Sequence, residues 1–194
     1  MTLRDFQKRK RASRKRKKLL KLVAKGFSVL LSKKNTTSKF LLILFIGFLI
    51  YEAWPRNPEK DLVNVTSVID GDTLETQGQR IRLFGIDALE KAQTCRKNGR
   101  AYKCGKEAAS ALSQKIGQKE LLCEGKNIDR YGRIVAICYV GDVDLNQWMV
   151  AQGYALAYRQ YSKLYVADEE MAKAKKRGMW SGAFKKPWDY RQKK

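Results

Sequence analysis

The chain has 194 residues, enough for one domain of ordinary size with additional segments but cramped for two full domains. Lys and Arg outnumber Asp and Glu by 41 to 19, and the sequence contains no histidine. The absence of histidine excludes Ser-His-Asp and Cys-His catalytic systems, HExxH zinc sites and enzymes that use histidine as their general base. Any catalysis therefore depends on carboxylates, lysine, arginine, tyrosine or a bound metal ion.

The positive charge is concentrated at the N-terminus. Residues 1–39 carry 15 Lys and Arg against one Asp, whereas residues 40–60 have no net charge and residues 61–194 carry 24 against 16. Two interpretations of residues 1–39 are open: a basic run with an amphipathic helix at a membrane surface, or a segment that binds nucleic acid directly. Residues 61–194 are moderately basic, which suits a surface that faces a polyanion.

Residues 40–54 form a strongly hydrophobic segment, and Phe40 to Tyr51 contain no charged residue. A transmembrane helix needs about 20 residues and the hydrophobic region of a signal peptide about 7–15, so length favours a signal peptide or a short anchor. No clear small-residue cleavage site follows. We therefore expect an uncleaved signal anchor or transmembrane segment, with cleavage and secretion as the alternative.

The orientation of this segment follows from its flanking charges. Lys and Arg lie overwhelmingly on its N-terminal side, which the positive-inside tendency keeps in the cytoplasm. The following domain would then lie outside the cytoplasm, in a periplasm or at the cell surface. A mitochondrial membrane is the rival location, since residues 1–39 are rich in Lys and Arg and contain a single acid.

Four cysteines lie apart from one another, with no Cys-x-x-Cys pair and no histidine as co-ligand, so a zinc site is disfavoured. Two disulfides fit an exported domain better. Of the three possible connectivities we favour Cys95 with Cys104, closing a loop, and Cys123 with Cys138, across neighbouring strands. Four reduced thiols are the alternative.

After a linker at 55–61, the sequence alternates in the manner of short strands, with Gly71 and Gly78 at turns. Ala, Leu and Ile at helical spacing then predict a helix at 105–116. Two more strands follow, separated by a polar loop. The five expected strands are at 62–69, 73–78, 80–86, 120–125 and 133–140.

Helices dominate the C-terminal part. Residues 144–153 predict a helix with Asp144 as its N-cap and Gly153 as its stop, and residues 166–178 predict another, with acids early and bases late. Together with the helix at 105–116, these elements predict a mainly β fold with α (α+β): a five-stranded OB-fold barrel decorated with about three helices.

The sequence IDGDT, at 69–73, permits two interpretations. Asp-Gly is a strong signal for a hairpin turn, yet the two aspartates also supply oxygen ligands for a metal. A second acidic element, RIRLFGIDALE at 80–90, ends with Asp87 and Glu90 after two arginines. A third, DRYGR at 129–133, places an arginine beside a tyrosine.

Each of these elements alone is explained by a turn, a salt-bridged strand end or a polar loop. Taken together they have a chemical meaning. Carboxylates hold a hard divalent cation, arginines clamp a phosphate, and a further carboxylate activates water. Those are the parts needed to cleave a phosphodiester bond.

The ordered set IDGDT, RIRLFGIDALE, DRYGR, DLNQWMVAQGYALAY and GMW resembles the staphylococcal nuclease (thermonuclease) family over residues 62–188. The combination is specific although each piece is not. The resemblance implies an OB-barrel with helices at 62–188. The residues after it, 189–194, are expected to be a basic tail. It also implies calcium-dependent cleavage of DNA and RNA with low sequence specificity.

The resemblance assigns the metal ligands by position. It implies Asp72 and Asp87 as the calcium carboxylates, with Asp70 at the start of the turn that presents Asp72. Ala88 would contribute its backbone carbonyl. The family also has Thr at this position, but a carbonyl ligand does not depend on the side chain.

The resemblance likewise assigns the catalytic residues. Glu90 is implied as the general base or water-orienting group, and Arg82 and Arg133 as ligands of the scissile phosphate that stabilise charge in the transition state. The family pattern usually has proline just before the glutamate, where this chain has Leu89. Because proline fixes φ, its loss puts the aim of Glu90 in question.

Tyr131, Tyr158 and Tyr161 resemble aromatic positions near the nucleotide pocket of the family, where rings stack on bases. Packing at the barrel rim is the alternative. The implied partners are nucleic acid, with single strands expected to be preferred, and a membrane through residues 40–54. The alternative function, motivated by Leu89, is a catalytically inactive OB-fold module that binds nucleic acid while tethered to a membrane.

Overall fold

The computed structural model describes residues 7, 11, 44–48 and 60–192. Residues 44–48 are helical, and the remainder of the hydrophobic segment predicted at 40–54 lies outside the described residues, as does nearly all of the basic segment 1–39. Within the described residues, no helix has both the length and the apolar character that crossing a membrane requires. A compact unit begins at Lys60.

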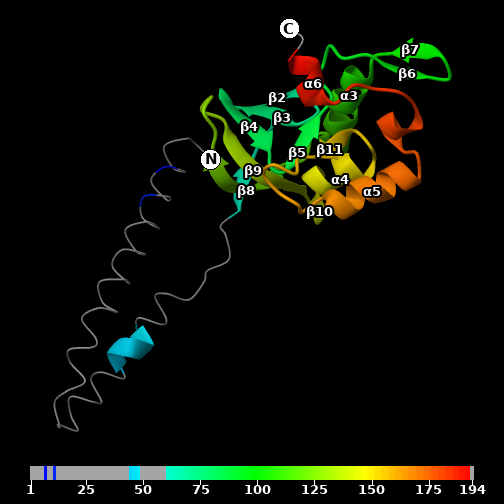
Figure 1. Cartoon of the computed structure of the whole chain (residues 1–194). Coiled ribbons are helices and arrows are strands. Elements are labelled where there is room, and N and C mark those ends of the chain that lie inside the picture. Colours follow the sequence, from blue (N-terminus) through cyan, green and yellow to red (C-terminus); the bar gives the residue numbers. More distant parts are fainter. Residues whose placement is uncertain (1–6, 8–10, 12–43, 49–59, 193–194) are drawn as a thin grey trace. The chain divides into compact units, whose positions relative to one another are not determined.

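A curled, mainly antiparallel sheet forms the body of this unit (Figure 1). Its strand order is β1-β8-β9-β4-β3-β2, with β10 paired to β9, and β4 and β9 run parallel. The strands are β1 Asp61–Val63, β2 Ser67–Asp70, β3 Thr73–Thr76, β4 Gln79–Leu83, β8 Leu121–Ile128, β9 Ile134–Val140 and β10 Val143–Asp144.

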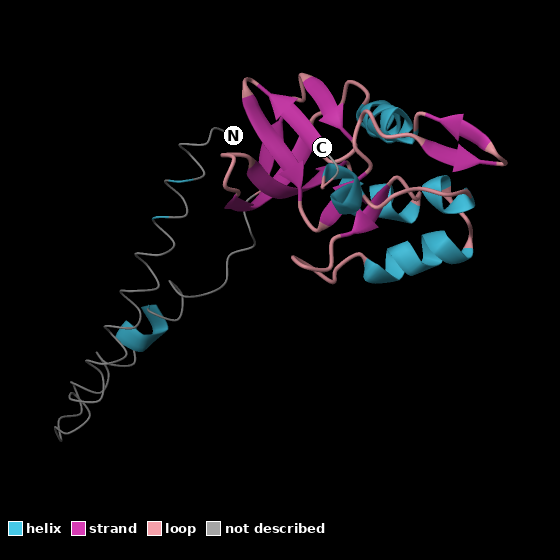
Figure 2. Cartoon of the chain, turned by 45° about the horizontal axis from the view of Figure 1, so that its top comes forward, coloured by secondary structure: helices cyan, strands magenta, loops and turns pink. Residues whose placement is uncertain are grey.

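Helices lie together beside the curled sheet (Figure 2). Those predicted from sequence are present, and the Asp144 side chain accepts the Gln147 N–H at 3.0 Å, so it is the N-cap. The α5 helix ends earlier than predicted, because Lys176 adopts a left-handed φ of 50°. The helices are α3 Cys104–Ile116, α4 Leu145–Ala151, α5 Val166–Ala174, the 3-10 helix η1 Gly178–Ser181 and α6 Pro187–Arg191.

The predicted α+β, OB-like class is confirmed, but the strands are more numerous than the five expected. The segment 62–69 contains parts of two strands because β1 pairs with β8 whereas β2 pairs with β3. Two further pairs were not predicted, since each strand is too short for a visible alternation. They are β5 Ile86–Ala88 with β11 Ala155–Ala157, and β6 Cys95–Lys97 with β7 Arg100–Tyr102.

Both favoured disulfides are present in the structure. Cys123 and Cys138 are directly opposed on β8 and β9, with their Cα atoms 4.1 Å apart. Cys95, at the start of β6, is bonded to Cys104, the first residue of α3, with a Cα separation of 5.6 Å. The second bond belongs to a small apolar cluster that joins the β6–β7 hairpin to the C-terminal segment.

Candidate active site

The sequence IDGDT forms the tight turn between β2 and β3. Asp70 is paired with Thr73 across the turn, and the Asp72 N–H donates to Asp70 Oδ1 at 3.1 Å. This side chain to backbone bond stabilises the turn locally. The turn interpretation of IDGDT is therefore right, and the same turn directs Asp72 into the domain, where it is 3% exposed.

Gly71 allows this turn to approach β5 closely. A Cβ atom on Gly71 would lie 2.7 Å from the Cβ of Ala88, too close for any larger residue without a shift. At this separation Asp72 Oδ2 accepts the Ala88 N–H at 2.9 Å. The turn and β5 thus bring together the two segments that carry Asp72 and Asp87.

Arg82 connects the two aspartates. Its Nη1 lies 2.7 Å from Asp72 Oδ1, and its Nη2 lies 2.7 Å from Asp87 Oδ1. Arg82 is positioned by β4, directly opposite Thr73 on β3. Since the Asp87 side chain is fully buried and that of Arg82 is 17% exposed, the carboxylates converge on a positive charge at the edge of the interior.

A second arginine, Arg191 of helix α6, covers the acids from outside. Its Nη2 lies 2.8 Å from Asp87 Oδ2, and its Nη1 lies 2.7 Å from Glu90 Oε1. Arg191 lies in the segment 189–194, predicted to be a basic tail, and no local pattern distinguishes it there. Its role depends on a contact between residues 101 positions apart.

Leu89, which replaces the proline of the family pattern, is anchored by burial. Its side chain is 1% exposed and belongs to the cluster around the Cys95–Cys104 disulfide. Burying a leucine contributes about 2 kcal/mol, so packing holds the backbone before Glu90 where a proline would restrict φ. The structure therefore gives no support to a freely moving Glu90.

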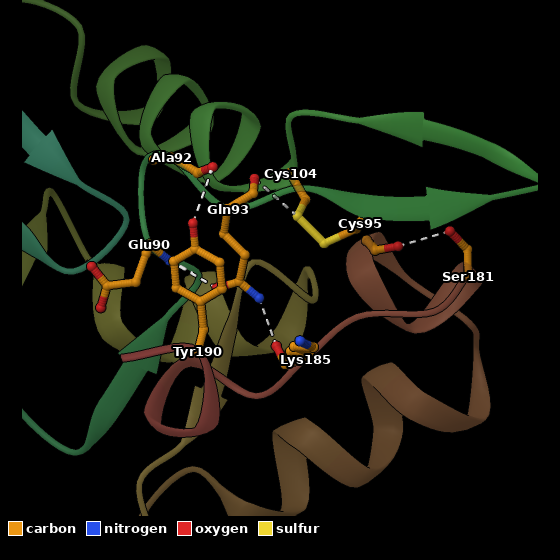
Figure 3. The surroundings of a disulfide bond; sticks show 9 residues. Glu90, Ala92, Gln93, Cys95, Cys104, Ser181, Lys185 and Tyr190 are labelled. Atoms are coloured by element: carbon orange, nitrogen blue, oxygen red, sulfur yellow. Dashed lines mark hydrogen bonds between the residues drawn. A yellow bond between two sulfur atoms is a disulfide. The ribbon is translucent and has the colours of Figure 1, made fainter. Parts of the chain in front are cut away.

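Gln93 fixes the loop that follows (Figure 3). Its Oε1 accepts the Glu90 N–H at 3.3 Å, its own N–H donates to Glu90 O at 2.7 Å, and its Nε2 donates to Lys185 O at 2.6 Å. Gly105 of α3 packs on the same loop, because a Cβ there would lie 1.7 Å from Glu90 O. Gln93 was not recognised from sequence, where it is one polar loop residue among many.

Arg133 is not in contact with the acids of the site. Within the described residues its ion pair is with Asp129, at 2.7 Å between Nε and Oδ2. Burial alone would raise the pKa of Asp129, but hydrogen bonds from Arg133 and from the Tyr131 N–H outweigh it and lower the pKa. The guanidinium also lies 5.4 Å from the centre of the Tyr131 ring, which is exposed.

The other two candidate tyrosines lie beside helix α6. The rings of Tyr158 and Tyr161 are 5.0 Å apart, and Tyr158 stacks on Trp188 with 6.0 Å between ring centres. Tyr161 is exposed, whereas Tyr158 is partly covered. Trp188 was not predicted as a site residue, yet it places an aromatic face on the helix that carries Arg191.

Burial dominates the electrostatics of Asp72. It raises the pKa of the Asp72 carboxyl from 3.8 to about 6, with the charge of Arg82 acting against it and that of Asp70 adding to it. For Arg191, burial alone would lower the pKa, but the bonds to Asp87 and Glu90 raise it. Arg191 therefore stays charged, whereas the raised pKa means that the Asp72 carboxyl takes up a proton as the pH decreases through about 6.

The acids suit a hard cation. Carboxylate oxygens are the ligands that calcium prefers, and the buried oxygens of Asp72 and Asp87 already meet at a positive guanidinium. Within the described part of the chain, no cluster of three or more acidic, cysteine or histidine side chains is arranged to hold a metal. A cation here would need other oxygens, such as backbone carbonyls and water, besides the two aspartates.

An OB-type barrel flanked by helices, with buried carboxylates and arginines gathered at one rim, defines the class of OB-fold nuclease domains. Residues 80–182 match the family model described as staphylococcal nuclease homologue, and the chain belongs to this family. The match includes Arg82, Asp87, Glu90 and Arg133. Asp72 and Arg191 lie outside it.

Several proteins are similar to the chain. "Succinoglycan biosynthesis protein ExoI" of Rhizobium meliloti is 39% identical over 123 residues, which cover 61% of this chain and 64% of that protein. An "Uncharacterized endonuclease" of Haemophilus influenzae is 35% identical, covering 78% of this chain and 81% of the relative. "Micrococcal nuclease" of Shigella flexneri is 32% identical, covering 66% and 79%. Membership of this family supports a hydrolase that acts on nucleic acid.

Proposed function

We propose that the protein is a calcium-dependent nuclease that hydrolyses phosphodiester bonds of DNA, RNA or both, with low sequence specificity. The observation that carries the proposal is the meeting of Asp72, Asp87 and Glu90 at two guanidinium groups, in a domain of a nuclease family. Buried carboxylates are costly to ionise, and a domain that only binds nucleic acid has no use for them.

Asp72 and Asp87 would hold the calcium ion, which supplies a Lewis acid that polarises a phosphate oxygen. Arg82 is held between the two aspartates, so its guanidinium is already oriented for a phosphate placed at the same rim. Positive charge placed beside the reacting phosphate stabilises the transition state. Arg133 is a candidate second phosphate ligand once it exchanges Asp129 for the substrate.

Glu90 is the proposed base that orients and deprotonates water. Its carboxylate points away from the disulfide-bonded loop (Figure 3), and the backbone on either side is fixed by Leu89 and Gln93. Tyr161, and Tyr131 on the β8–β9 loop, offer exposed rings on which bases can stack. Such contacts are tolerant of sequence, which agrees with low specificity.

We also propose that the domain is exported and held at a membrane by residues 40–54, with residues 1–39 in the cytoplasm. The two disulfides and the charge asymmetry around the segment support this location. Protease added to cells whose outer layers have been opened, but whose cytoplasmic membrane is intact, should digest the domain while residues 1–39 survive. Protection of the domain under these conditions, or recovery of a soluble cleaved form, would contradict anchoring.

Cleavage of single-stranded DNA by the purified oxidised protein tests the activity. We expect cleavage with calcium, little with chelator, and loss of activity in Glu90→Gln and Arg82→Ala. A folded but inert wild-type protein that binds nucleic acid equally with and without calcium would instead indicate the inactive binding module, whose affinity should decrease steeply with salt.

A further inference from the structure

The β6–β7 hairpin projects from the body of the domain (Figures 1 and 2) and has no part in the site described above. Its strands are in register from Cys95–Tyr102 to Lys97–Arg100. The connecting Asn98 and Gly99 both have positive φ, 50° and 76°, as a tight two-residue hairpin turn requires. A short isolated hairpin is marginally stable, so this one depends on what holds its base.

The hairpin is strongly cationic. No acid occurs between Lys91 and Lys106. Lysines and arginines of this stretch are exposed, and within the described residues they form no ion pair, in contrast to Arg82 and Arg191 at the acids. The cations of the hairpin and the residue after it are Arg96, Lys97, Arg100 and Lys103. Unneutralised charge in such density attracts a polyanion.

A cleft of about 730 Å³ lies at the hairpin. Lys97 and Arg100 line it on the hairpin side, and Tyr102 and Tyr154 are also among its lining residues. Glu107 is the carboxylate among its lining residues. The volume falls within the range of small-molecule sites, and cationic groups beside aromatic rings suit a nucleotide, whose phosphate and base they can each contact.

The base of the hairpin is fixed to the loop that carries Glu90. The disulfide joins Cys95 to α3, and the Gly105 N–H donates to Gln93 O at 3.2 Å. On the other side, Arg96 and Ala183 exchange two backbone hydrogen bonds of 2.9 and 2.8 Å. Figure 3 shows the disulfide and Gln93 side by side. The base of the hairpin is therefore joined through α3 and Gln93 to the loop that carries Glu90.

We propose that the β6–β7 hairpin and its cleft form a second nucleic-acid-binding surface, which holds backbone phosphates and one nucleotide of a polymeric substrate away from the scissile bond. The proposal rests on the proposed function for the identity of the polymer. Nucleic acid is favoured over an anionic lipid surface because the cations adjoin a cleft lined by two tyrosines and the base of the hairpin is joined to the Glu90 loop.

Binding of a long single-stranded oligonucleotide in the presence of chelator tests the surface independently of cleavage. The test variant replaces Arg96, Lys97, Arg100 and Lys103 by Gln in the full chain, and the control variant replaces four other exposed, unpaired lysines, Lys119, Lys163, Lys175 and Lys176. We expect the test variant to bind about tenfold more weakly and to lose about 0.7 from the salt-dependence slope per phosphate contact removed. Residues 1–39 are present in both variants, so their contribution cancels.

Chemical acetylation of lysines adds a measurement at single residues. We expect the oligonucleotide to protect Lys97 and Lys103 but not Lys163 or Lys175. Equal protection of all four lysines, or protection of the hairpin by anionic vesicles and not by the oligonucleotide, would overturn the proposal. Equal binding by the two variants would overturn it as well.

Measurements of cleavage distinguish failure of the second binding surface from failure of the proposed nuclease function. If the protein cleaves, the ratio of kcat/KM for a long strand to that for a dinucleotide-sized diester should decrease about tenfold in the test variant. If the protein is inert yet the test variant binds weakly, the proposed catalysis fails and the second surface stands. If cleavage is normal and this ratio is unchanged, the second surface fails alone.

Discussion

The acid-lined rim, formed by Asp72, Asp87 and Glu90, and the β6–β7 hairpin both carry cationic side chains. The two regions differ in whether those cations are paired with acids. At the rim, Arg82 and Arg191 are bound to carboxylates, two of which are buried. On the hairpin, Lys97 and Arg100 are exposed and form no ion pair within the described residues. Paired arginines are held in fixed orientations, whereas unpaired cations attract a ligand over a distance. The difference separates a region built for chemistry from one built for capture.

The largest effect should follow from removing the reacting groups of the rim. Glu90→Gln keeps the size of the side chain but removes the base, and we expect kcat to decrease by about 10²–10⁴-fold. Glu120→Gln, an exposed carboxylate without an ion pair in the described residues, is the matched control and should cleave at the wild-type rate. Comparable losses in both variants would mean that Glu90 has no special role.

A smaller effect is expected from a substitution that moves the Glu90 loop but replaces none of the acids and arginines of the rim. Gly105→Ala places a Cβ 1.7 Å from Glu90 O, so either α3 or the Glu90 loop must move. Because a 1 Å misplacement at an active site costs about 10²-fold, we expect a decrease in kcat of about 10–100-fold together with a lower melting temperature. Ser110→Ala, on an exposed position of α3, controls for the helix. Wild-type kcat in Gly105→Ala would show that the position of the loop is unimportant.

Removing Arg191 should strengthen calcium binding at the acids, whereas the two preceding substitutions weaken catalysis. Arg191 neutralises Asp87 and Glu90, so a calcium ion at Asp87 competes with it. We expect Arg191→Ala to bind calcium several-fold more tightly in a calorimetric titration without nucleic acid, on the order of 1 kcal/mol. Arg130→Ala, which removes an exposed arginine from the β8–β9 loop, controls for net charge. Weaker calcium binding in Arg191→Ala alone would contradict competition.

The last effect concerns the stability of the fold and its dependence on pH, not activity. The pKa of Asp72 is about 6 in the folded chain against an ordinary value of 3.8, so the folded state retains a proton that the unfolded chain releases. The contribution of Asp72 to stability is therefore greatest below about pH 4 and decreases as pH rises to about 6. Asp72→Asn should remove this decrease, which is on the order of 1–3 kcal/mol. Urea unfolding at several pH values in chelator measures it; parallel profiles for both proteins would contradict the assignment.

Long elements of the fold could be predicted from the sequence, whereas the shortest ones could not. The helix at 105–116 and the cap at Asp144 depend on local patterns, and both were predicted. The two short strand pairs, β5–β11 and β6–β7, were missed because three residues are too few to show an alternation. The β6–β7 hairpin nevertheless carries one local signal, because Asn98-Gly99 is the dipeptide typical of a two-residue hairpin turn.

The residues of the site also fall into two groups, those that lie in local sequence motifs and those that are brought to the site only by the tertiary structure. Asp72, Asp87 and Glu90 lie in two short motifs that resemble a known family, so their proximity could be predicted. Arg191 and Gln93 act through contacts that only the tertiary structure creates, with α6 and with the Lys185 carbonyl. The role of Arg133 at the phosphate stays a prediction, and in the structure its guanidinium is paired with Asp129.

The most direct measurement of the central claim is the rate of single-stranded DNA cleavage as a function of calcium concentration, for wild type and Asp87→Asn. The buried pair of aspartates should give a rate that saturates with calcium in the wild type, and little cleavage at any calcium concentration in the variant. Cleavage that persists in chelator, or a variant with the wild-type calcium dependence, would contradict the proposed metal site.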